Sequence, residues 1–500
     1  MRRLSLLVCA ALLVARGASA QISPHISPTL VLDPSVRPPE LRAPSVTPSP
    51  STAPALSAAG AQAAQEGRAC AGCPRRSVGK AILQTTLVNV LYGLGNLARG
   101  EETAKITPET WWKNMSHGWE WDLNDFVTNQ FGHPYQGNNY FTSGRANGLS
   151  FWESSALTAF GSATWEFYGE TNDASLNDFI NTTLGGIALG EMFHRTAWLM
   201  RDTEATGKGR LWREIGATIL DPLTGYNRFV SGDASRVTEK PPAMVPSTLG
   251  SVGSAGVLWH KSTSGSLQDS SADPFAEVDL LYADLKSGRS RTAYDAFGVR
   301  LAFGGGRAIS EARVRGRLLG QPFRNDTWQL TLSQGYQYNN NDAYRFGAQS
   351  VETNLGVVKP LGSRWSVWAL GWGGVTILGA VDSVPIPTVT PITSNEEPTS
   401  RDYDYGPGTN AGGFLNFIRG NRSIVTLTYE LHHLHVIDGV RGNHLLQRLR
   451  ADADWPLRGP LGIGVSGDLF DRRTFYQQAD VPDAHSQFPQ VRVFLSWSVP

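Results

Sequence analysis

The stretch Ser423–Val436 reads SIVTLTYELHHLHV, and its side chains alternate in character from one residue to the next. Successive side chains of a β-strand point to opposite faces of the sheet, so this stretch has one apolar and one polar face. The apolar face carries Val425, Leu427, Tyr429 and Leu431, and the polar face carries Thr426, Thr428, Glu430 and His432. This pattern is typical of a transmembrane β-barrel wall, which faces lipid outside and a polar lumen inside.

The same two-residue period continues through the second half of the chain, over residues 250–500. We count twelve segments that show it, at 253–261, 274–286, 291–304, 308–320, 324–338, 344–358, 364–380, 408–419, 422–437, 443–456, 461–476 and 489–499. A soluble β-sandwich would show the same alternation. Aromatic residues near the strand ends favour the membrane, because they gather at membrane–water interfaces; they are Trp259, Trp328, Tyr336, Tyr338, Trp365, Trp372, Trp455, Phe475 and Tyr476.

The composition excludes two other classes of protein. The chain has 500 residues, of which 18% are charged and 15 are Trp. Its mean hydropathy is −0.23, and beyond the first residues no apolar run reaches the ~20 residues that a membrane-spanning helix needs. A polytopic helical membrane protein is therefore excluded. The 44 Lys and Arg residues balance 44 Asp and Glu residues, so the basic surface that nucleic-acid binding requires is not expected.

The first 76 residues indicate export. Residues 1–20 have the pattern of a signal peptide, with Arg2 and Arg3, an apolar core over Leu4–Val14 and Ala18-Ser19-Ala20 as cleavage site. Residues 21–76 are rich in Pro, Ala and Ser, so we predict a disordered periplasmic linker. Cys70 and Cys73 near its end could form a redox pair, half a zinc site or a linker disulfide, and we favour the disulfide.

Residues 77–230 have the pattern of a helical domain. Apolar residues recur at helical spacing over Ser77–Arg99, and two long helices are expected at Arg145–Glu170 and Ser175–Arg201. The segment 129–141, NQFGHPYQGNNYF, is rich in Gly, Pro and Asn and predicts a loop. Small residues on the helices would allow them to approach closely; they are Gly161, Gly185, Gly186 and Gly190.

A few polar residues in this domain form a candidate site. Glu166 and Glu170 share one helix face, Asp178 and Asn181 share a face of the next helix, and His133 lies in the preceding segment. Two acids beside a histidine could hold a metal or serve as general acid and base. The structural alternative is that these side chains cap helices and satisfy one another. Since no phosphate-binding or zinc-protease motif is present, we predict no cofactor and no metal.

Several motifs in this domain resemble a bacterial family. They are the run Trp119–Phe141, Arg145–Gly148, Trp165–Glu170, Asn177–Gly186 and Asp221–Arg228. Together they are similar to the domain of unknown function 3943, over about residues 110–230. The resemblance implies an exported bacterial protein of no established activity, often with a β-rich second half. A weaker resemblance to VanZ-like and YfiM-like helical families places His133, Glu166, Asp178 and Asn181 at positions matching polar residues there.

The polar face of the predicted strands allows two interpretations of the lumen. It carries Arg300, Arg313, Arg315, Arg317, Arg448, Arg450 and Arg492 with Glu430, Asp452 and Asp454. These side chains could line an anion-selective pore, or they could pair with one another and close the barrel. The Pro-rich segment Asp382–Tyr405 is expected to be a long extracellular loop.

We therefore predict an α+β protein. A periplasmic or membrane-associated helical domain precedes an antiparallel transmembrane β-barrel of about 12 strands in the outer membrane, in contact with its lipid. The first functional hypothesis is a structural or transport-related barrel with a helical plug or docking domain. The alternative is an envelope enzyme that acts on a lipid or other membrane-derived substrate through His133, Glu166, Asp178 and Asn181.

Overall fold

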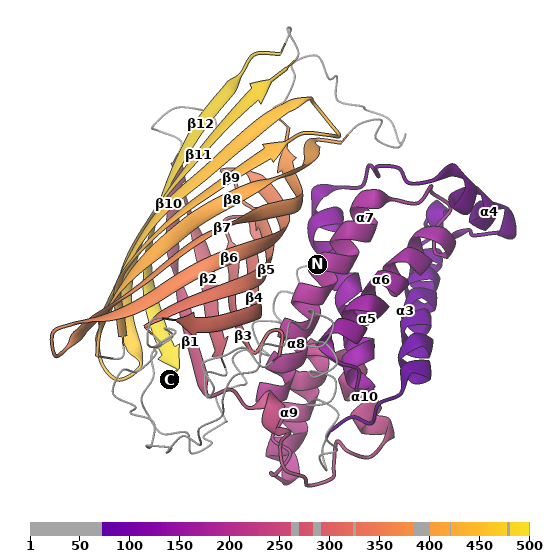
Figure 1. The fold of residues 1–500 in the computed structure, drawn as a ribbon, viewed down its shortest axis with the longest axis horizontal. Coiled ribbons are helices and arrows are strands. Elements are labelled where there is room, and N and C mark those ends of the chain that lie inside the picture. The colour runs from indigo at the N-terminus through magenta and orange to yellow at the C-terminus, as the bar shows by residue number, and fades with distance from the viewer. Residues whose placement is uncertain are drawn as a thin grey trace, which may run out of the picture.

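A helical region followed by a closed β-barrel makes up the protein (Figure 1). The computed structural model describes residues 73–261, 270–283, 292–323, 327–383, 401–420, 422–477 and 481–499. The predicted signal peptide, residues 21–72 of the predicted linker and residues 384–400 of the predicted extracellular loop lie outside the described residues. Cys73 is disulfide-bonded.

The helical region begins at Val78 and ends at Val230. Its longer helices are α3 (Val78–Ala98), α4 (Pro108–His117), α5 (His133–Ala146), α6 (Phe151–Tyr168), α7 (Leu176–Ile180), α8 (Gly186–Met200), α9 (Gly207–Leu220) and α10 (Pro222–Val230). Two π-helical turns, η3 (Thr128–Gly132) and η4 (Asn181–Gly185), lead into α5 and α8. No described helix is both long and apolar enough to cross a membrane.

The predicted loop at 129–141 is wrong, because most of it is helix α5. Its small and polar residues are buried at a close helix crossing. A Cβ atom on Gly186 would lie 2.6 Å from the Cα atom of Gly137 in α5. The Gly and Asn residues that suggested a loop are therefore used for close packing, and tertiary contacts override their weak helix propensity. The predicted role of Gly186 in a close helix approach is confirmed.

Twelve antiparallel strands close into a barrel, which confirms the predicted fold class. The strands are β1 (Thr248–Lys261), β2 (Ser270–Ala283), β3 (Ala296–Gly304), β4 (Arg307–Phe323), β5 (Trp328–Asn340), β6 (Arg345–Leu361), β7 (Trp365–Asp382), β8 (Tyr403–Arg419), β9 (Arg422–His435), β10 (Gly442–Pro456), β11 (Leu461–Tyr476) and β12 (Ala484–Val499). Each strand pairs with its sequence neighbours, and β12 closes the ring on β1 with Ala255 opposite Leu495.

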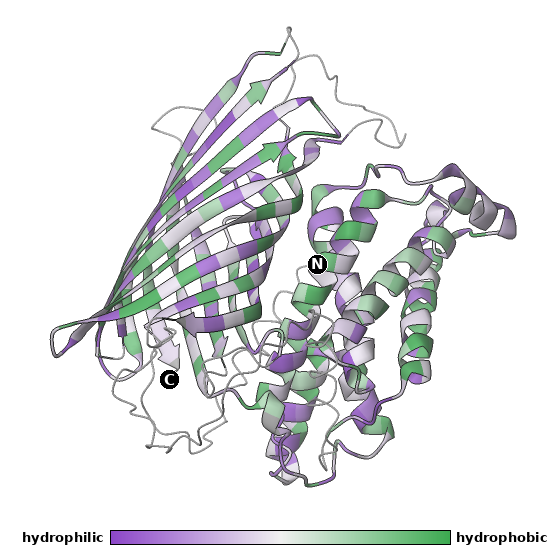
Figure 2. Cartoon of the chain, in the orientation of Figure 1, coloured by the Kyte–Doolittle hydropathy of each residue, from purple (hydrophilic) through white to green (hydrophobic). Residues whose placement is uncertain are grey.

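The alternation predicted for the strands separates the two faces of the wall (Figure 2). On β10, Arg448 and Arg450 are buried in the lumen while Leu449 between them is 51% exposed on the outside. On β12, Arg492 is buried and its neighbours Val491 and Val493 are exposed. An outer surface of exposed apolar side chains around a charged interior is what a lipid-facing barrel wall requires.

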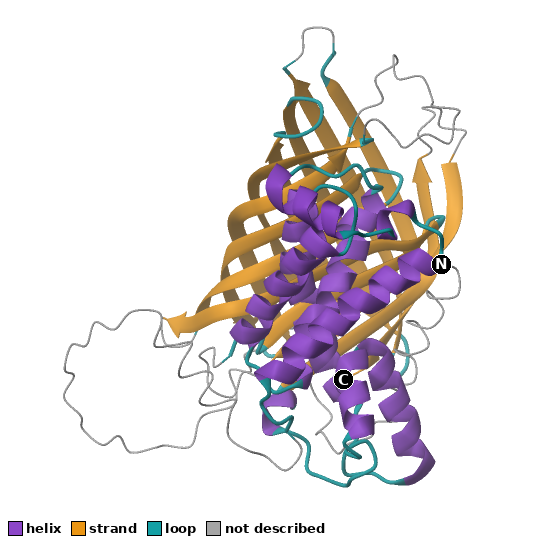
Figure 3. Ribbon diagram, turned by 90° about the vertical axis from the view of Figure 1, so that its right-hand side faces the viewer, coloured by secondary structure: helices purple, strands orange, loops and turns teal. Residues whose placement is uncertain are grey.

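The helical domain packs against the outer face of the barrel wall (Figure 3). Tyr336 and Gln334 on β5 point outward, since their neighbours Ser333 and Gly335 share the lumen face with Gln329 and Thr331. The Tyr336 hydroxyl donates to the Gln130 carbonyl oxygen at 2.9 Å, and Gln334 donates to the Leu184 carbonyl oxygen at 2.8 Å. These contacts place the helical domain beside the barrel wall, outside the lumen.

Candidate functional site

The polar residues predicted as a site come together where α5, α6 and α7 meet. His133 is the first residue of α5 and follows the π-helical turn η3. Asp178 lies in α7, and Asn181 begins the π-helical turn η4. Short π-helical turns within helices occur frequently at functional sites. Both turns bracket this cluster.

His133 and Asp178 form the closest histidine–carboxylate pair of the cluster. Nε2 of His133 lies 3.6 Å from Oδ2 of Asp178, and Nδ1 lies 3.3 Å from the hydroxyl of Thr182. The His133 side chain is 7% exposed and that of Asp178 is 4% exposed. A buried imidazole beside a buried carboxyl is the arrangement that general acid–base chemistry uses.

Glu166 and Glu170 extend the cluster, and both have structural contacts. Oε2 of Glu166 accepts a hydrogen bond of 2.9 Å from the Ser175 backbone N–H, just before α7 begins. Oε1 of Glu166 is buried with no hydrogen-bond partner among the described residues. Oε1 of Glu170 accepts a hydrogen bond from Nε1 of Trp165. The two carboxyl groups therefore position chain segments and still leave one oxygen free inside the domain.

Asn181 and Asn138 carry buried amide groups that the described residues leave unpaired. Both side chains are fully buried, and neither the oxygen nor the nitrogen of either amide has a hydrogen-bond partner there. Leaving a buried polar group unpaired costs about 1–3 kcal/mol. Such groups in a folded protein commonly bind an ordered water or a ligand. The cluster thus has hydrogen-bond donors and acceptors that its internal contacts do not use.

Burial sets the protonation of the cluster. It lowers the pKa of His133, so the imidazole is neutral at neutral pH. Burial, followed by repulsion from Asp122, raises the pKa of Asp178 well above its ordinary value. Burial also raises the pKa of Glu170 to about 7. At neutral pH the cluster thus holds a neutral imidazole beside carboxyl groups whose pKa values are raised, so it could accept and donate a proton.

Three further residues surround the cluster and were not named as site residues from the sequence: Asp122, Tyr405 and Arg401. Asp122, in the Trp-rich motif, accepts a hydrogen bond of 2.6 Å from Nδ2 of Asn129. From the barrel, the Tyr405 hydroxyl accepts a hydrogen bond of 3.3 Å from Nδ2 of Asn177. Arg401 donates to the Asp122 carbonyl oxygen at 2.6 Å. Asp122 could have been suspected from its motif, but the barrel residues lie more than 200 positions away.

The described residues offer no group of three His, Cys, Asp or Glu side chains placed to hold a metal ion.

The barrel lumen is a second candidate functional site. Ion pairs between strands cross it. Arg448 on β10 pairs with Glu311 on β4 at 3.0 Å, and these strands are directly opposite each other in the ring. Arg313 on β4 also pairs with Glu430 on β9. Arg450 pairs with Glu277 on β2 at 2.8 Å. Each charged side chain predicted for the lumen forms an ion pair, in most cases with a residue outside the predicted set.

An apolar cluster fills the lumen at the end where residues 383 and 401 lie. It consists of buried Tyr344, Phe346, Ala348, Val381, Leu434, Leu446, Phe470 and Phe488. The guanidinium carbon of Arg448 lies 4.9 Å from the centre of the Phe470 ring, so the ionic layer and the apolar cluster are in contact. On the other side of the ionic layer is a cavity of about 430 Å³, lined by Ser254, Thr331, Trp368 and Phe414 among others.

One family model matches part of the helical region. Residues 118–223 match a family described as Domain of unknown function (DUF3943). This range contains the whole candidate cluster, from Asp122 to Asn181, and confirms the resemblance predicted for these residues. The likeness to VanZ-like and YfiM-like families stays a prediction. A search of curated proteins found no match.

Similar solved structures are bacterial barrels. The NanC porin is 8% identical, with coverage of 50% of this chain and 99% of that chain and a TM-score of 0.26. An outer membrane channel from Pseudomonas putida F1 is 10% identical, with coverage of 50% and 94% and a TM-score of 0.21. A loop-deletion mutant of the Vibrio cholerae outer membrane protein OmpT is 10% identical, with coverage of 50% and 99% and a TM-score of 0.20.

Proposed function

We propose that this protein is a non-conducting β-barrel of the bacterial outer membrane that anchors its helical domain at the membrane. The ion pair between Arg448 and Glu311 carries this proposal, because it joins opposite sides of the wall through the lumen. The buried aromatic and aliphatic side chains of the apolar cluster around Phe470 add a second layer that occupies the lumen. An open diffusion pore needs a continuous polar path, and these two layers interrupt it.

The location rests on the barrel wall and on the predicted signal peptide. The outer surface is apolar at residues such as Leu449, Val465 and Val491, so it is suited to lipid. Most connections at the end of the barrel where β12 finishes are short, as in Leu361–Trp365 and Pro456–Leu461, and the longer one there joins Ala283 to Ala296. Outer-membrane barrels have their short turns in the periplasm, which supports a periplasmic position for the predicted linker.

Conductance of the purified full chain tests the proposal. We expect no steady ionic current after reconstitution into a planar lipid bilayer. A folded barrel must be present in the same sample, and heat-modifiable migration on a gel reports it. A steady current from protein that shows this migration would overturn the non-conducting function, whereas a soluble protein without heat-modifiable migration would overturn the membrane location.

A second candidate function is acid–base chemistry on a lipid or other membrane-derived substrate. The neutral His133 beside Asp178 favours it, together with the unpaired amides of Asn138 and Asn181. The test compares outer-membrane lipids from cells that carry the wild type, Asp178→Asn or no protein. Chemistry requires that the variant stays folded while its lipid profile matches that of the cells without the protein. A wild-type lipid profile from the folded variant would contradict this function.

A further inference from the structure

The helical domain has an apolar face on the side away from the barrel. Helix α3 lies on the side of the helical domain away from the barrel and packs on α5 and α6 (Figure 1). Large apolar side chains on α3 and α6 are between 41% and 67% exposed; they are Ile82, Leu87, Leu91, Leu94, Trp152 and Phe160. We call this surface the α3–α6 face. Contiguous apolar surface of this kind marks a contact with a protein or with lipid.

The exposed and half-buried uncharged polar side chains of α3 bond within the protein, whereas Oγ1 of Thr85 is buried without a hydrogen-bond partner among the described residues. Between Ala81 and Ala98 the only exposed polar side chain is Thr86, and its hydroxyl donates to the Ile82 carbonyl oxygen at 3.0 Å. Nε2 of Gln84 donates to Asn227 at 2.5 Å, and Nδ2 of Asn89 donates to the Gly161 carbonyl oxygen at 3.1 Å. The outward side of this helix therefore has no polar group that needs a hydrogen bond from water, as a surface in contact with hydrocarbon requires.

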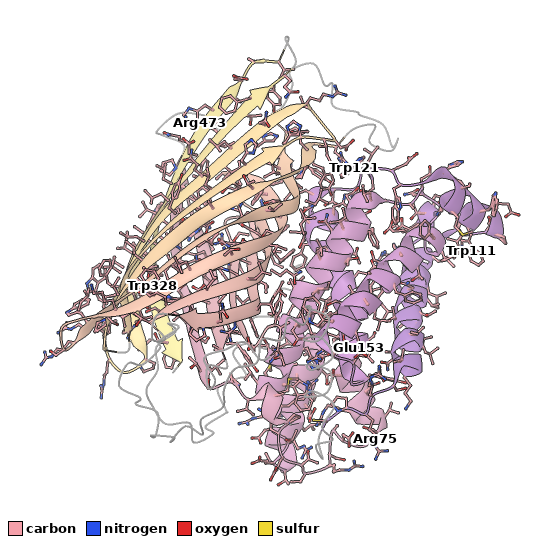
Figure 4. All side chains as sticks on the ribbon, viewed as in Figure 1. Arg75, Trp111, Trp121, Glu153, Trp328 and Arg473 are labelled. Carbon is pink, nitrogen blue, oxygen red and sulfur yellow. The ribbon has the colours of Figure 1, made fainter. Side chains whose placement is uncertain are left out.

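Charged and aromatic residues mark the two ends of the face. Lys80 and Arg99 bound residues 81–98, which contain no charged residue and extend for about 27 Å as a helix. The apolar band of an outer-membrane barrel is of the same height, about 25 Å. Figure 4 shows Arg75 and Glu153 toward one end of the helical layer and Trp111 toward the other. Arg76 and Glu153 form a salt bridge of 2.7 Å at the first end.

The helical domain is docked on the outer, lipid-facing side of the barrel wall. The domain covers a patch of outer wall whose polar groups, including Gln334 and Tyr405, bond to it. Elsewhere the outer wall exposes apolar residues such as Leu449 and Leu427. The domain therefore occupies space at the wall that lipid would otherwise fill, and the α3–α6 face continues the apolar surface around it.

We propose that the α3–α6 face contacts the acyl chains of the same bilayer that holds the barrel. This rests on the proposed function, because it requires the barrel to be in a membrane. Helix α3 does not have to be apolar all round as an isolated spanning helix would. Its inner side is covered by α5 and α6, and only its outer side meets lipid.

Depth-dependent fluorescence quenching tests this proposal. Single cysteines replace Leu87 on the α3–α6 face, Leu449 on the barrel wall and Lys208 in α9, all of which are exposed. Each is labelled with bimane in the mature chain, which lacks Cys9 of the predicted signal peptide and in which Cys73 is disulfide-bonded. The protein is placed in phosphatidylcholine vesicles that carry a nitroxide on the acyl chains. We expect loss of fluorescence at Leu87→Cys as large as at Leu449→Cys, and retention at Lys208→Cys.

The other outcomes separate the two proposals. Quenching at Leu449→Cys but not at Leu87→Cys would overturn lipid contact by the α3–α6 face and leave the barrel in the membrane. In that case, iodide in the aqueous phase distinguishes a water-exposed face, which it quenches, from a face covered by a second copy or another protein, which it does not. Absence of lipid quenching at Leu449→Cys would overturn the membrane location itself.

Discussion

Arg448 on β10 and Glu311 on β4 form a salt bridge of 3.0 Å through the lumen. Nε of Arg448 also donates to Asp468 on β11 at 2.7 Å, and Arg313 lies 3.3 Å from the other oxygen of Glu311. Each charge in this layer has more than one opposite neighbour, and the layer ties strands that are far apart in the ring. Charges buried in this way are stabilising only while their partners remain.

Substitution Glu311→Gln is expected to lower the free energy of unfolding by about 3 kcal/mol, because it leaves Arg448 and Arg313 buried with fewer opposite charges. The matched control is Asp402→Asn, since the pair of Asp402 with Arg345 is at the rim and Asp402 is 68% exposed. That change should cost less than about 1 kcal/mol. Urea unfolding in micelles, followed by gel migration, measures both. Equal costs would show that the lumen layer does not stabilise the barrel.

Substitution Gly186→Ala should force α8 away from α5, because the new Cβ atom would lie 2.6 Å from the Cα atom of Gly137. Backbone shifts of this kind cost about 1–3 kcal/mol. The control is Gly93→Ala in α3, where a Cβ atom meets nothing within 4 Å and where alanine stabilises the helix by about 1 kcal/mol. Thermal melting followed by far-UV circular dichroism should move in opposite directions for the two variants.

The stability of the helical domain should depend on pH through Glu170. Its pKa is about 7 in the folded protein against 4.5 ordinarily, so between these values the folded state binds more protons than the unfolded state. Stability therefore falls as pH rises through this window. The melting temperature of the wild type should decrease from about pH 5 to about pH 8, and Glu170→Gln should reduce that decrease. An unchanged pH profile in the variant would mean that another group is responsible.

Substitution Tyr405→Phe should loosen the docking of the helices on the barrel. It removes the acceptor for Nε2 of Gln130 at 3.0 Å and for Nδ2 of Asn177 at 3.3 Å. Each buried donor left unpaired costs about 1–3 kcal/mol. Faster hydrogen exchange in η3 and α7 is the expected readout. Tyr429→Phe is the control, because Tyr429 is 42% exposed on the free outer wall and should leave those amides unchanged.

The strands could be predicted because each carries its own pattern of burial. All twelve predicted segments overlap the strands of the barrel. Helix α3, at Val78–Ala98, was also predicted within one residue at each end. Helix α5 was not predicted. Its Gly and Asn residues are required by the contacts of this helix with η4 and α8, and helix propensity does not take tertiary contacts into account.

The candidate site was predicted in part. His133 and Asp178 were named from motif and spacing, and the fold brings them to 3.6 Å. Tyr405 and Arg401 could not be named, because they reach the cluster from the barrel through contacts between distant parts of the chain. Whether the cluster performs chemistry stays a prediction.

The sequence by itself determined the architecture of this protein, because a strand that faces lipid on one side and charge on the other must alternate residue by residue. Only the tertiary structure decided which residues pair across the lumen and how the helical domain contacts the barrel. An ion pair crosses the lumen because Arg448 and Glu311 meet from opposite strands. The helices stand outside the barrel because the outer wall carries Gln334, Tyr336 and Tyr405, whose polar groups need partners that lipid cannot supply.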